Sequence, residues 1–370
     1  MAKAVKFTGR QHEFFNTLNQ RVNGYFKTNG ISRNANSEMV IKTIFMFALY
    51  FTPYAITLLL PVTNYGIYLL LYVVMGFGVG GIGLSIMHDA NHGAYSSKSW
   101  INNALGYSLN LVGANALNWK IQHNVLHHTF TNVFDVDEDI SPRGALRFAP
   151  ESPWKSFHRF QYLYAWFLYG LMTIVWVITK DFMRLVRYQK EGMLAKQKVN
   201  VFNEWAILIL TKVFYIGYIF VIPLVILPFS GWQILGAILL MHYVAGFILA
   251  IIFQPAHVIE GTEYFQPDET GSIENTWAIH QMLTTTNFAQ KNKILSWYVG
   301  GLNYQVEHHL FPNICHVHYR DISGIVESTA KEFGVPYKKV DTFIGALIAH
   351  GKLLKVLGKN EKVEITPSYS

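Results

Sequence analysis

Four long runs of apolar residues divide the chain, and polar segments separate the first pair from the second. The runs cover about 44–62, 67–87, 205–229 and 232–253. Each has about the 20 residues that a helix needs to cross a hydrocarbon layer of about 30 Å. The joints within each pair, residues 63–66 and 228–231, contain no charged residue. The pattern therefore predicts four transmembrane helices arranged as two hairpins.

Two weaker apolar stretches lie between the pairs. The stretch at about 102–117 is too short and too polar to cross a membrane, so we expect a re-entrant or interfacial helix there. The stretch at about 157–182 is aromatic-rich, but polar residues occupy both of its ends. We expect it to lie at the membrane interface. If it crossed instead, the histidine groups before and after it would face opposite sides.

Lysine and arginine residues gather at the ends of the runs that lie away from the two joints, for example Lys42, Lys190 and Lys291. Basic residues favour the cytoplasmic side of a membrane. We therefore predict a multi-pass integral membrane protein with both termini and every charged segment in the cytoplasm. The predicted fold class is an all-α, single-domain protein over 1–370, with a cytoplasmic helical cap.

The composition supports a membrane protein. Hydrophobic residues make up 51% of the chain and charged residues only 14%, against about a quarter charged in soluble proteins. The net charge of +7 comes without a dense basic stripe with interleaved aromatics, so nucleic-acid binding is not indicated. The single cysteine, Cys315, excludes an internal disulfide and a cysteine-based metal cluster within one chain.

Histidines are the candidate metal ligands of this chain. Seven of the 15 form three groups: HDANH at 88–92, HNVLHH at 123–128 and QVEHH at 305–309. Histidines four residues apart share one face of a helix, so both can reach one metal ion. A single pair of histidines at this spacing more often has a structural role. Seven clustered imidazoles on one predicted side exceed the needs of a single ion and imply two metals. Zinc would fit, but iron is favoured because it can activate oxygen.

These three boxes resemble those of the membrane fatty acid desaturase family, and Gln305 at the head of the third box resembles the front-end branch, including linoleoyl-CoA-desaturase-like members. The resemblance implies O2-dependent desaturation of a fatty acyl chain at a non-haem di-iron centre, with no catalytic residue beyond the metal centre. The implied ligands, with an extra histidine after the fourth run, are His88, His92, His123, His127, His128, His257, His308 and His309. Gln305 is implied as a weak ligand or a holder of water.

Many front-end desaturases carry a fused haem domain with a His-Pro-Gly-Gly motif, which this sequence lacks. We therefore expect electrons from a separate ferredoxin or cytochrome b-type protein with its reductase. The substrate would be a fatty acyl-CoA or an acyl-lipid in the bilayer. The basic segments suit either an acidic electron carrier or anionic lipid.

Several residues near the boxes are candidates for supporting roles. Asp89 and Asn91 are expected to support the neighbouring ligands, and His280 is expected to do so or to line the substrate tunnel. The acidic run at 135–139 is expected to be mostly a solvated loop. His242, inside the fourth run, is expected to be buried and hydrogen-bonded. We expect the remaining histidines at the surface or interface: His12, His158, His316, His318 and His350.

Two other functions compete with desaturation. A di-iron hydroxylase acting on an alkyl chain, sterol or carotenoid would use the same metal centre. A membrane transporter or metal carrier would place polar residues within the spans and show internal repeats. We find no convincing repeat, and among the span residues only His242 is conspicuous.

Overall fold

The computed structural model describes residues 5–10, 12–140 and 144–359, and most of these are helical. They form two compact units. We call residues 37–121 and 166–250 the hairpin unit, and residues 1–36, 122–165 and 251–370 the histidine unit. The chain ends, 1–4 and 360–370, lie outside the described residues, so their predicted cytoplasmic location stays a prediction.

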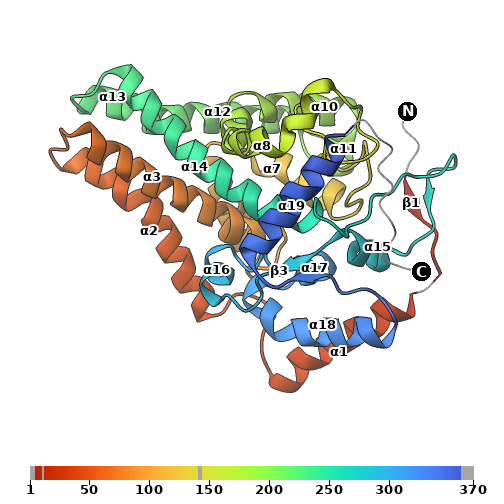
Figure 1. Ribbon diagram of the computed structural model, residues 1–370. Helices are drawn as coiled ribbons and strands as arrows, with labels where there is room; N and C mark the ends of the chain where they lie inside the picture. The colour runs from red at the N-terminus through yellow and green to blue at the C-terminus, as the bar shows by residue number, and fades with distance from the viewer. Residues whose placement is uncertain (1–4, 11, 141–143, 360–370) are drawn as a thin grey trace. The chain divides into compact units, whose positions relative to one another are not determined.

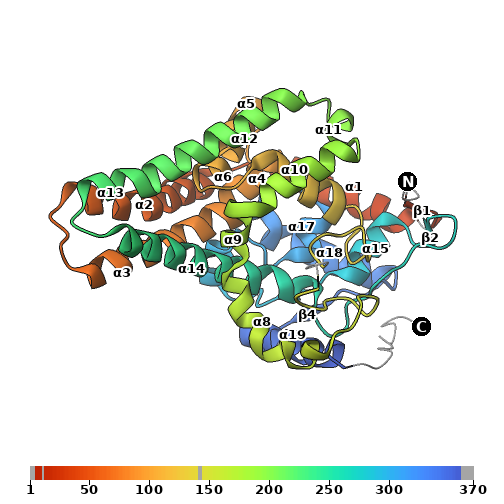
Figure 2. The same cartoon turned by 90° about the horizontal axis from the view of Figure 1, so that it is seen from above.

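The hairpin unit contains the predicted spans. Four helical stretches are long and apolar enough to cross a membrane: Ser37–Leu59, Tyr65–Asn91, Val201–Ile226 and Gly231–His257. Figures 1 and 2 show α2 (Ser37–Leu59) beside α3 (Tyr65–Gly81) as one hairpin, with α14 (Gly231–His257) returning from α13 (Ile222–Ile226) as the other. The predicted all-α membrane fold is confirmed.

Two of these stretches contain π-helical turns. The second stretch runs from α3 through the π-helix η1 (Ile82–Ile86) into α4 (Met87–Asn91). The third runs from α12 (Val201–Ile216) through η5 (Gly217–Val221) into α13. Insertions of this type are rare and often lie beside functional sites, and η1 leads directly into the first histidine box.

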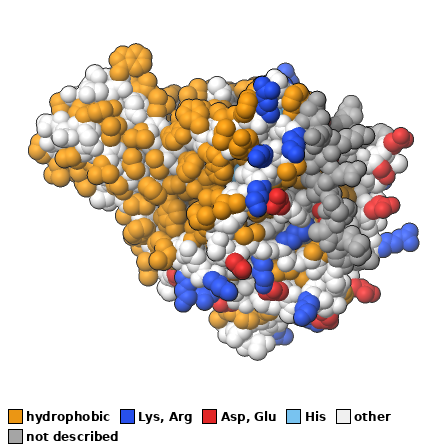
Figure 3. Space-filling view, viewed as in Figure 1, with side chains coloured by type: hydrophobic (Ala, Val, Ile, Leu, Met, Phe, Trp, Pro, Cys, Tyr) orange, Lys and Arg blue, Asp and Glu red, His pale blue; other side chains and the backbone are white. Residues whose placement is uncertain are grey.

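Small residues let these helices pack closely. A Cβ atom on Gly78 would lie 2.8 Å from the backbone nitrogen of Tyr50 in α2, so a larger residue would force the helices apart. Asn64 starts α3 by accepting a hydrogen bond from the Ile67 backbone at 3.1 Å. The hairpin surface is apolar: Figure 3 shows hydrophobic side chains gathered over the long helices, and Ile44, Leu70 and Val225 are exposed.

The weaker apolar stretches form broken helices. The first gives α5 (Ser99–Gly106), α6 (Ser108–Leu111) and α7 (Ala116–Lys120). The second is bent by 58° between Ser156–Gly170 and Met172–Lys190, which suits a broken span or a re-entrant loop. Its pieces are η3 (Ser156–Phe160), α8 (Gln161–Gly170), α9 (Met172–Val175), η4 (Trp176–Lys180), α10 (Asp181–Lys190) and, beyond it, α11 (Met193–Lys196). Their interfacial position stays a prediction.

Two polar residues on the long helices of the hairpin unit, His242 and Lys212, have hydrogen-bond partners in the same unit. His242 is buried as predicted, and its two ring nitrogens lie 2.5 Å from the Tyr215 hydroxyl and 3.3 Å from the Thr173 hydroxyl. Sequence analysis overlooked Lys212 in the third span. Its ammonium group donates to the Asp181 carboxylate at 2.7 Å and to the Gly113 carbonyl at 2.5 Å.

The histidine unit is built from short elements. Its helices are α1 (Glu13–Asn29), η2 (Ile121–His127, mostly in this unit), α15 (Trp277–Thr284), α16 (Lys293–Tyr298), α17 (Gln305–Leu310), η6 (His316–His318), α18 (Tyr319–Glu332) and α19 (Phe343–Leu357). Two parallel strand pairs join distant segments: β1 (Lys6–Phe7) with β2 (Ser272–Ile273), and β3 (Asn287–Phe288) with β4 (Lys339–Val340).

One hydrophobic core supports this unit. Leu18 and Val22 of α1 pack with Ile322 and Val326 of α18, and Leu310 of α17 joins the same core. The end of the third histidine box is therefore fixed to the helices of the unit by apolar contacts. Burial of such side chains is the main stabilising contribution to a fold.

Four of the five histidines expected at the surface are instead buried: His158, His316, His318 and His350. His350 of α19 donates to the Val258 carbonyl at 2.6 Å, and His158 bonds with the Gly144 carbonyl and the Lys155 backbone. The sequence did not predict this burial, because it depends on backbone groups that come close to these rings only when the chain folds. His12 is exposed as expected.

Candidate metal centre

The second histidine box lies on the π-helix η2 and in the turn that follows it. The backbone nitrogen of His128 bonds to the carbonyl of His123 at 2.9 Å, which is the five-residue spacing of a π-helix. In an α-helix these residues would point about 140° apart. The π turn instead brings their rings together, whereas the four-residue spacing predicts a pair of His123 and His127.

A first set of imidazoles, His123, His128 and His308, meets through Nε2 atoms. The Nε2 atom of His128 lies 3.2 Å from that of His123 and 2.9 Å from that of His308. On its other side, the Nδ1 atom of His308 contacts the Tyr319 hydroxyl at 3.1 Å. Nitrogen atoms bound to one ion at about 2.1 Å and at right angles would lie about 3 Å apart, so these separations suit a shared cation.

A second set consists of His127, His257 and His309, all fully buried. One nitrogen from each lies within 4.8 Å of the others. Their Nδ1 atoms face oxygen atoms: the Asp137 carboxylate at 3.0 Å, the Thr284 carbonyl at 3.3 Å and the Gln281 amide oxygen at 2.7 Å. Within the part of the chain that the structure describes, the Nε2 atoms of His127 and His257 have no hydrogen-bond partner.

These contacts determine which nitrogen carries the proton. A carboxylate and a carbonyl only accept, so His127 and His257 are protonated at Nδ1 and present the lone pairs of Nε2. Buried lone pairs without a donor are costly, and a bound cation satisfies them. Imidazole nitrogens suit iron, copper and zinc. The six histidines of this unit therefore fit a metal centre, and their arrangement is compatible with iron-dependent catalysis.

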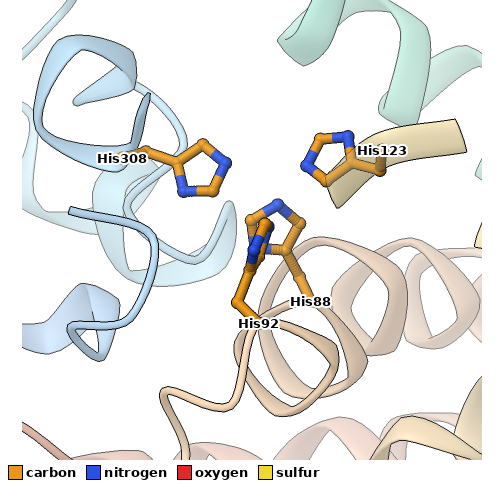
Figure 4. Close-up of side chains that lie close together, drawn as sticks. All are labelled: His88, His92, His123 and His308. Carbon is orange, nitrogen blue, oxygen red and sulfur yellow. The ribbon is translucent and has the colours of Figure 1, made fainter. Parts of the chain in front are cut away.

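His88 and His92 form a pair of their own in the hairpin unit. They lie one turn apart at the end of α4, with ring centroids 4.8 Å apart, and both rings contact Trp119 edge-on. Figure 4 shows these two rings side by side and also draws His123 and His308. The Asp89 carboxylate lies 3.8 Å from Nδ1 of His88. Asn91 is buried against Gly106, where a Cβ atom would collide with its amide.

The remaining predicted residues, Gln305 and His280, belong to the histidine unit. Gln305 is buried, and its amide faces His257 without a hydrogen bond of ordinary geometry. His280 donates from Nε2 to the Thr131 carbonyl at 2.7 Å, and it packs against Phe7 and Phe265. Burial lowers the pKa of His280 to about 4, so this ring is neutral. His280 thus supports the segment that follows the second box.

Asp137 corrects the expectation of a solvated acidic loop. It is fully buried, and its carboxylate accepts the Nδ1 proton of His127. Burial alone would lower the pKa of His127, but the charge and hydrogen bond of Asp137 outweigh burial and raise it. Asp139, partly exposed, lies 3.7 Å from the same ring, and Asp135 is exposed as expected. The three Asp residues shortly after the box were the available signal.

Glu307, inside the third box, was also missed. Its buried carboxyl group accepts hydrogen bonds from the Tyr337 hydroxyl at 2.8 Å and from the Asn287 amide at 2.9 Å. Burial raises the pKa of Glu307 to about 7, although these two bonds act in the opposite direction. The Asn287 side chain also accepts from the Val306 backbone at 2.9 Å. This network fixes the start of α17, and therefore its two histidines.

Known proteins resemble this chain along almost its whole length. A family model described as fatty acid desaturase matches residues 25–341. The sn-1 linoleoyl-lipid 6-desaturase of Synechocystis sp. is 38% identical over 361 residues, which cover 97% of this chain and 99% of that protein.

Two further relatives also match most of this chain. The acyl-lipid (8-3)-desaturase of Physcomitrium patens is 36% identical over 94% of this chain and 72% of its own length. The acyl-lipid (8-3)-desaturase of Mortierella alpina is 32% identical over 95% of this chain and 79% of its own. The predicted family and enzyme class are thereby confirmed, and the chain belongs to the fatty acid desaturase family.

Proposed function

We propose that this protein catalyses O2-dependent desaturation of a fatty acyl chain, with front-end regiochemistry, at two iron ions. The observation that carries the proposal is the convergence of six buried imidazoles in the histidine unit. His123, His128 and His308 would hold one ion, and His127, His257 and His309 the other. His88 and His92 of the first histidine box would be further ligands. Gln305, beside His257, would ligate weakly or hold a water.

The chemistry needs a metal, because side chains alone cannot break an unactivated methylene C–H bond. Bound iron supplies the oxidising power: two hydrogen atoms of the substrate, two electrons and two protons convert O2 to two molecules of water. The chain's own residues orient the imidazoles through Asp137, Thr284, Gln281 and Tyr319, and they keep bulk water away from the centre.

The substrate follows from the relatives. Their names specify linoleoyl-lipid and other acyl-lipid substrates, which supports a lipid-bound acyl chain over acyl-CoA as the substrate here. The electrons would come from a separate ferredoxin or cytochrome b-type protein with its reductase. The net charge of +7 favours an acidic carrier. The centre would face the cytoplasm, as the distribution of basic residues predicts.

Expression in a host that lacks polyunsaturated lipids and is fed linoleate tests the proposal. We expect a new double bond, located by mass spectrometry, between the existing one and the carboxyl end. His127→Ala and His309→Ala should abolish both the product and bound iron. The matched control is His12→Ala, which alters an exposed histidine and should retain both. A hydroxylated product would instead identify a hydroxylase, and metal transport without any product would identify a carrier.

A further inference from the structure

Asn132 lies in the loop that follows the second histidine box, and it has a positive φ angle of 56°. This conformation is uncommon for residues other than glycine, and Asn is among the few that tolerate it. Asn132 is fully buried. Buried polar groups require hydrogen-bond partners inside the protein, so the contacts of Asn132 show which segments this residue joins.

The side chain of Asn132 reaches the segment that carries His257. Its amide group donates to the backbone carbonyl of His257 at 2.9 Å and to that of Glu263 at 3.1 Å. An amide group has two donors, so it can make both bonds at once. The backbone carbonyl of Asn132 accepts from the Phe265 backbone at 3.1 Å. Asn132 thus joins the loop after the second box to a segment more than 100 residues away.

The backbone nitrogen of Asn132 makes a second connection, to the partner of His127. It donates at 3.0 Å to the Asp137 carboxylate oxygen that also accepts from Nδ1 of His127. The ring centroids of His127 and His257 lie 4.7 Å apart, with the ring planes at 86°. Both rings belong to the set whose nitrogen atoms lie within 4.8 Å of one another.

We propose that Asn132 is a positioning residue that sets the separation of His127 and His257, so that both imidazoles reach the same cation. Its side-chain amide holds the backbone of His257, and its backbone nitrogen holds His127 through Asp137. Contacts beyond the ligands orient them, and loss of one such contact typically weakens metal binding by about 10- to 100-fold. The inference depends on the proposed function, because it concerns an iron ion that these two histidines would share.

A purely structural role would have a different signature. The hydroxyl of Thr262 also donates to the His257 carbonyl, at 2.8 Å, but Thr262 is only five residues further along the chain. That bond is local, whereas the bond from Asn132 joins two ligand-bearing segments. If Asn132 only stabilised the fold, its loss would weaken iron binding whether or not His257 is present. If it acts through His257, its loss has no effect once His257 has been replaced.

The experiment is a double-variant cycle on the purified chain in detergent, with the wild type, Asn132→Gly, His257→Gln and the double variant. Glycine removes the amide group but readily adopts the positive φ angle and keeps the backbone nitrogen that bonds to Asp137. Each protein is loaded with iron and equilibrated with a series of chelator concentrations, and iron per chain is measured by mass spectrometry. The matched control is Asp135→Gly, because Asp135 is exposed and has a positive φ angle of 62° in the same loop.

We expect Asn132→Gly to lose iron at a chelator concentration about 10-fold lower than the wild type, and the control to follow the wild type. In the His257→Gln background, Asn132→Gly should cause no further shift. An equal shift in both backgrounds would overturn the inference in favour of a purely structural role. A wild-type curve for Asn132→Gly would also overturn it.

Asn132→Ser covers the case in which thermal unfolding shows that Asn132→Gly does not fold. The serine hydroxyl lies closer to the backbone than the amide nitrogen and supplies one donor in place of two. Iron loss at a lower chelator concentration than in the wild type is expected, again only when His257 is present. If neither variant folds while the control does, the role of Asn132 is structural and the inference is wrong. A wild type that folds but binds no iron would instead refute the proposed function, so the two failures are distinguishable.

Discussion

The buried histidines of the two units differ in how their ring nitrogens are satisfied. In the hairpin unit, both nitrogens of His242 face hydroxyl groups, of Tyr215 and Thr173. In the histidine unit, His127 and His257 are hydrogen-bonded through Nδ1, and their Nε2 atoms have no hydrogen-bond partner among the described residues. All three rings are buried. Burial thus does not separate His242 from the two candidate ligands, whereas the partner of the second nitrogen distinguishes these three rings.

The same rule applies within the histidine unit. His158 is buried and both of its nitrogens contact backbone groups, the Gly144 carbonyl and the Lys155 nitrogen. It therefore has the structural pattern of His242, although it belongs to the unit that holds the candidate metal centre. The distinction comes from local hydrogen bonding and not from the unit.

The largest expected effect tests this distinction directly. His257→Gln should reduce desaturation by more than about 100-fold and remove about one iron per chain, because even the loss of an outer-shell partner costs 10- to 100-fold. His242→Gln should keep both irons. Product analysis by gas chromatography and iron quantitation provide the readouts. Equal loss of iron in both variants would break the comparison.

A second prediction concerns the charged pair of the hairpin unit. Lys212→Met leaves the Asp181 carboxylate buried without its cation, so we expect a loss of about 3–5 kcal/mol in the free energy of unfolding. The double variant Lys212→Met with Asp181→Leu should recover most of this loss. Thermal unfolding in detergent gives the measurement. A double variant less stable than Lys212→Met would show that the pair has another role.

A third prediction uses pH. Burial lowers the pKa of His350 to about 4, below the value of about 6.5 in an unfolded chain. The contribution of the neutral His350 ring to the free energy of unfolding is therefore complete above pH 6.5. It is lost as the pH falls toward 4, by up to about 3 kcal/mol. His350→Gln should have a shallower loss of unfolding free energy over this range than the wild type. The control, His12→Gln, should follow the wild-type curve, and parallel curves for all three proteins would contradict the assignment.

The smallest expected effect concerns the hydrogen bonds to the buried carboxyl group of Glu307. Tyr337→Phe removes one donor to the buried carboxyl group and should cost about 1–3 kcal/mol of stability. Because the Asn287 bond remains, iron per chain should stay at the wild-type value. Chemical unfolding and metal analysis on the same sample test this. A loss of iron from Tyr337→Phe would mean that this hydroxyl group also positions the third box.

Much of the architecture could be predicted from residue order. The apolar runs predicted the four long helical stretches, with every bound within seven residues of the observed one, since length and hydrophobicity decide whether a helix can cross a membrane. The broken helices in the two weaker stretches were not predicted. Their pieces bond to partners distant in the chain, such as Asn110, whose amide reaches the hydroxyl of Thr211.

The candidate site, like the fold, could be predicted only in part from the sequence. Spacing alone identified the histidines of the three boxes, but it paired His123 with His127 on the assumption of an α-helix. The π turn pairs His123 with His128 instead. Spacing also gave no reason to select Asp137 from its acidic neighbours, because their burial depends on how the loop folds.

The sequence by itself determined the membrane class, the desaturase family and which imidazoles are candidates for the metals, because each of these depends on residue type and local spacing. Only the tertiary structure decided which rings share a set and which nitrogen of each ring faces inward. It also showed that His350 and His158 are buried and hydrogen-bonded to backbone groups. Those properties depend on acceptors such as the Asp137 carboxylate and the Thr284 carbonyl, and folding alone brings these within hydrogen-bonding distance of the rings.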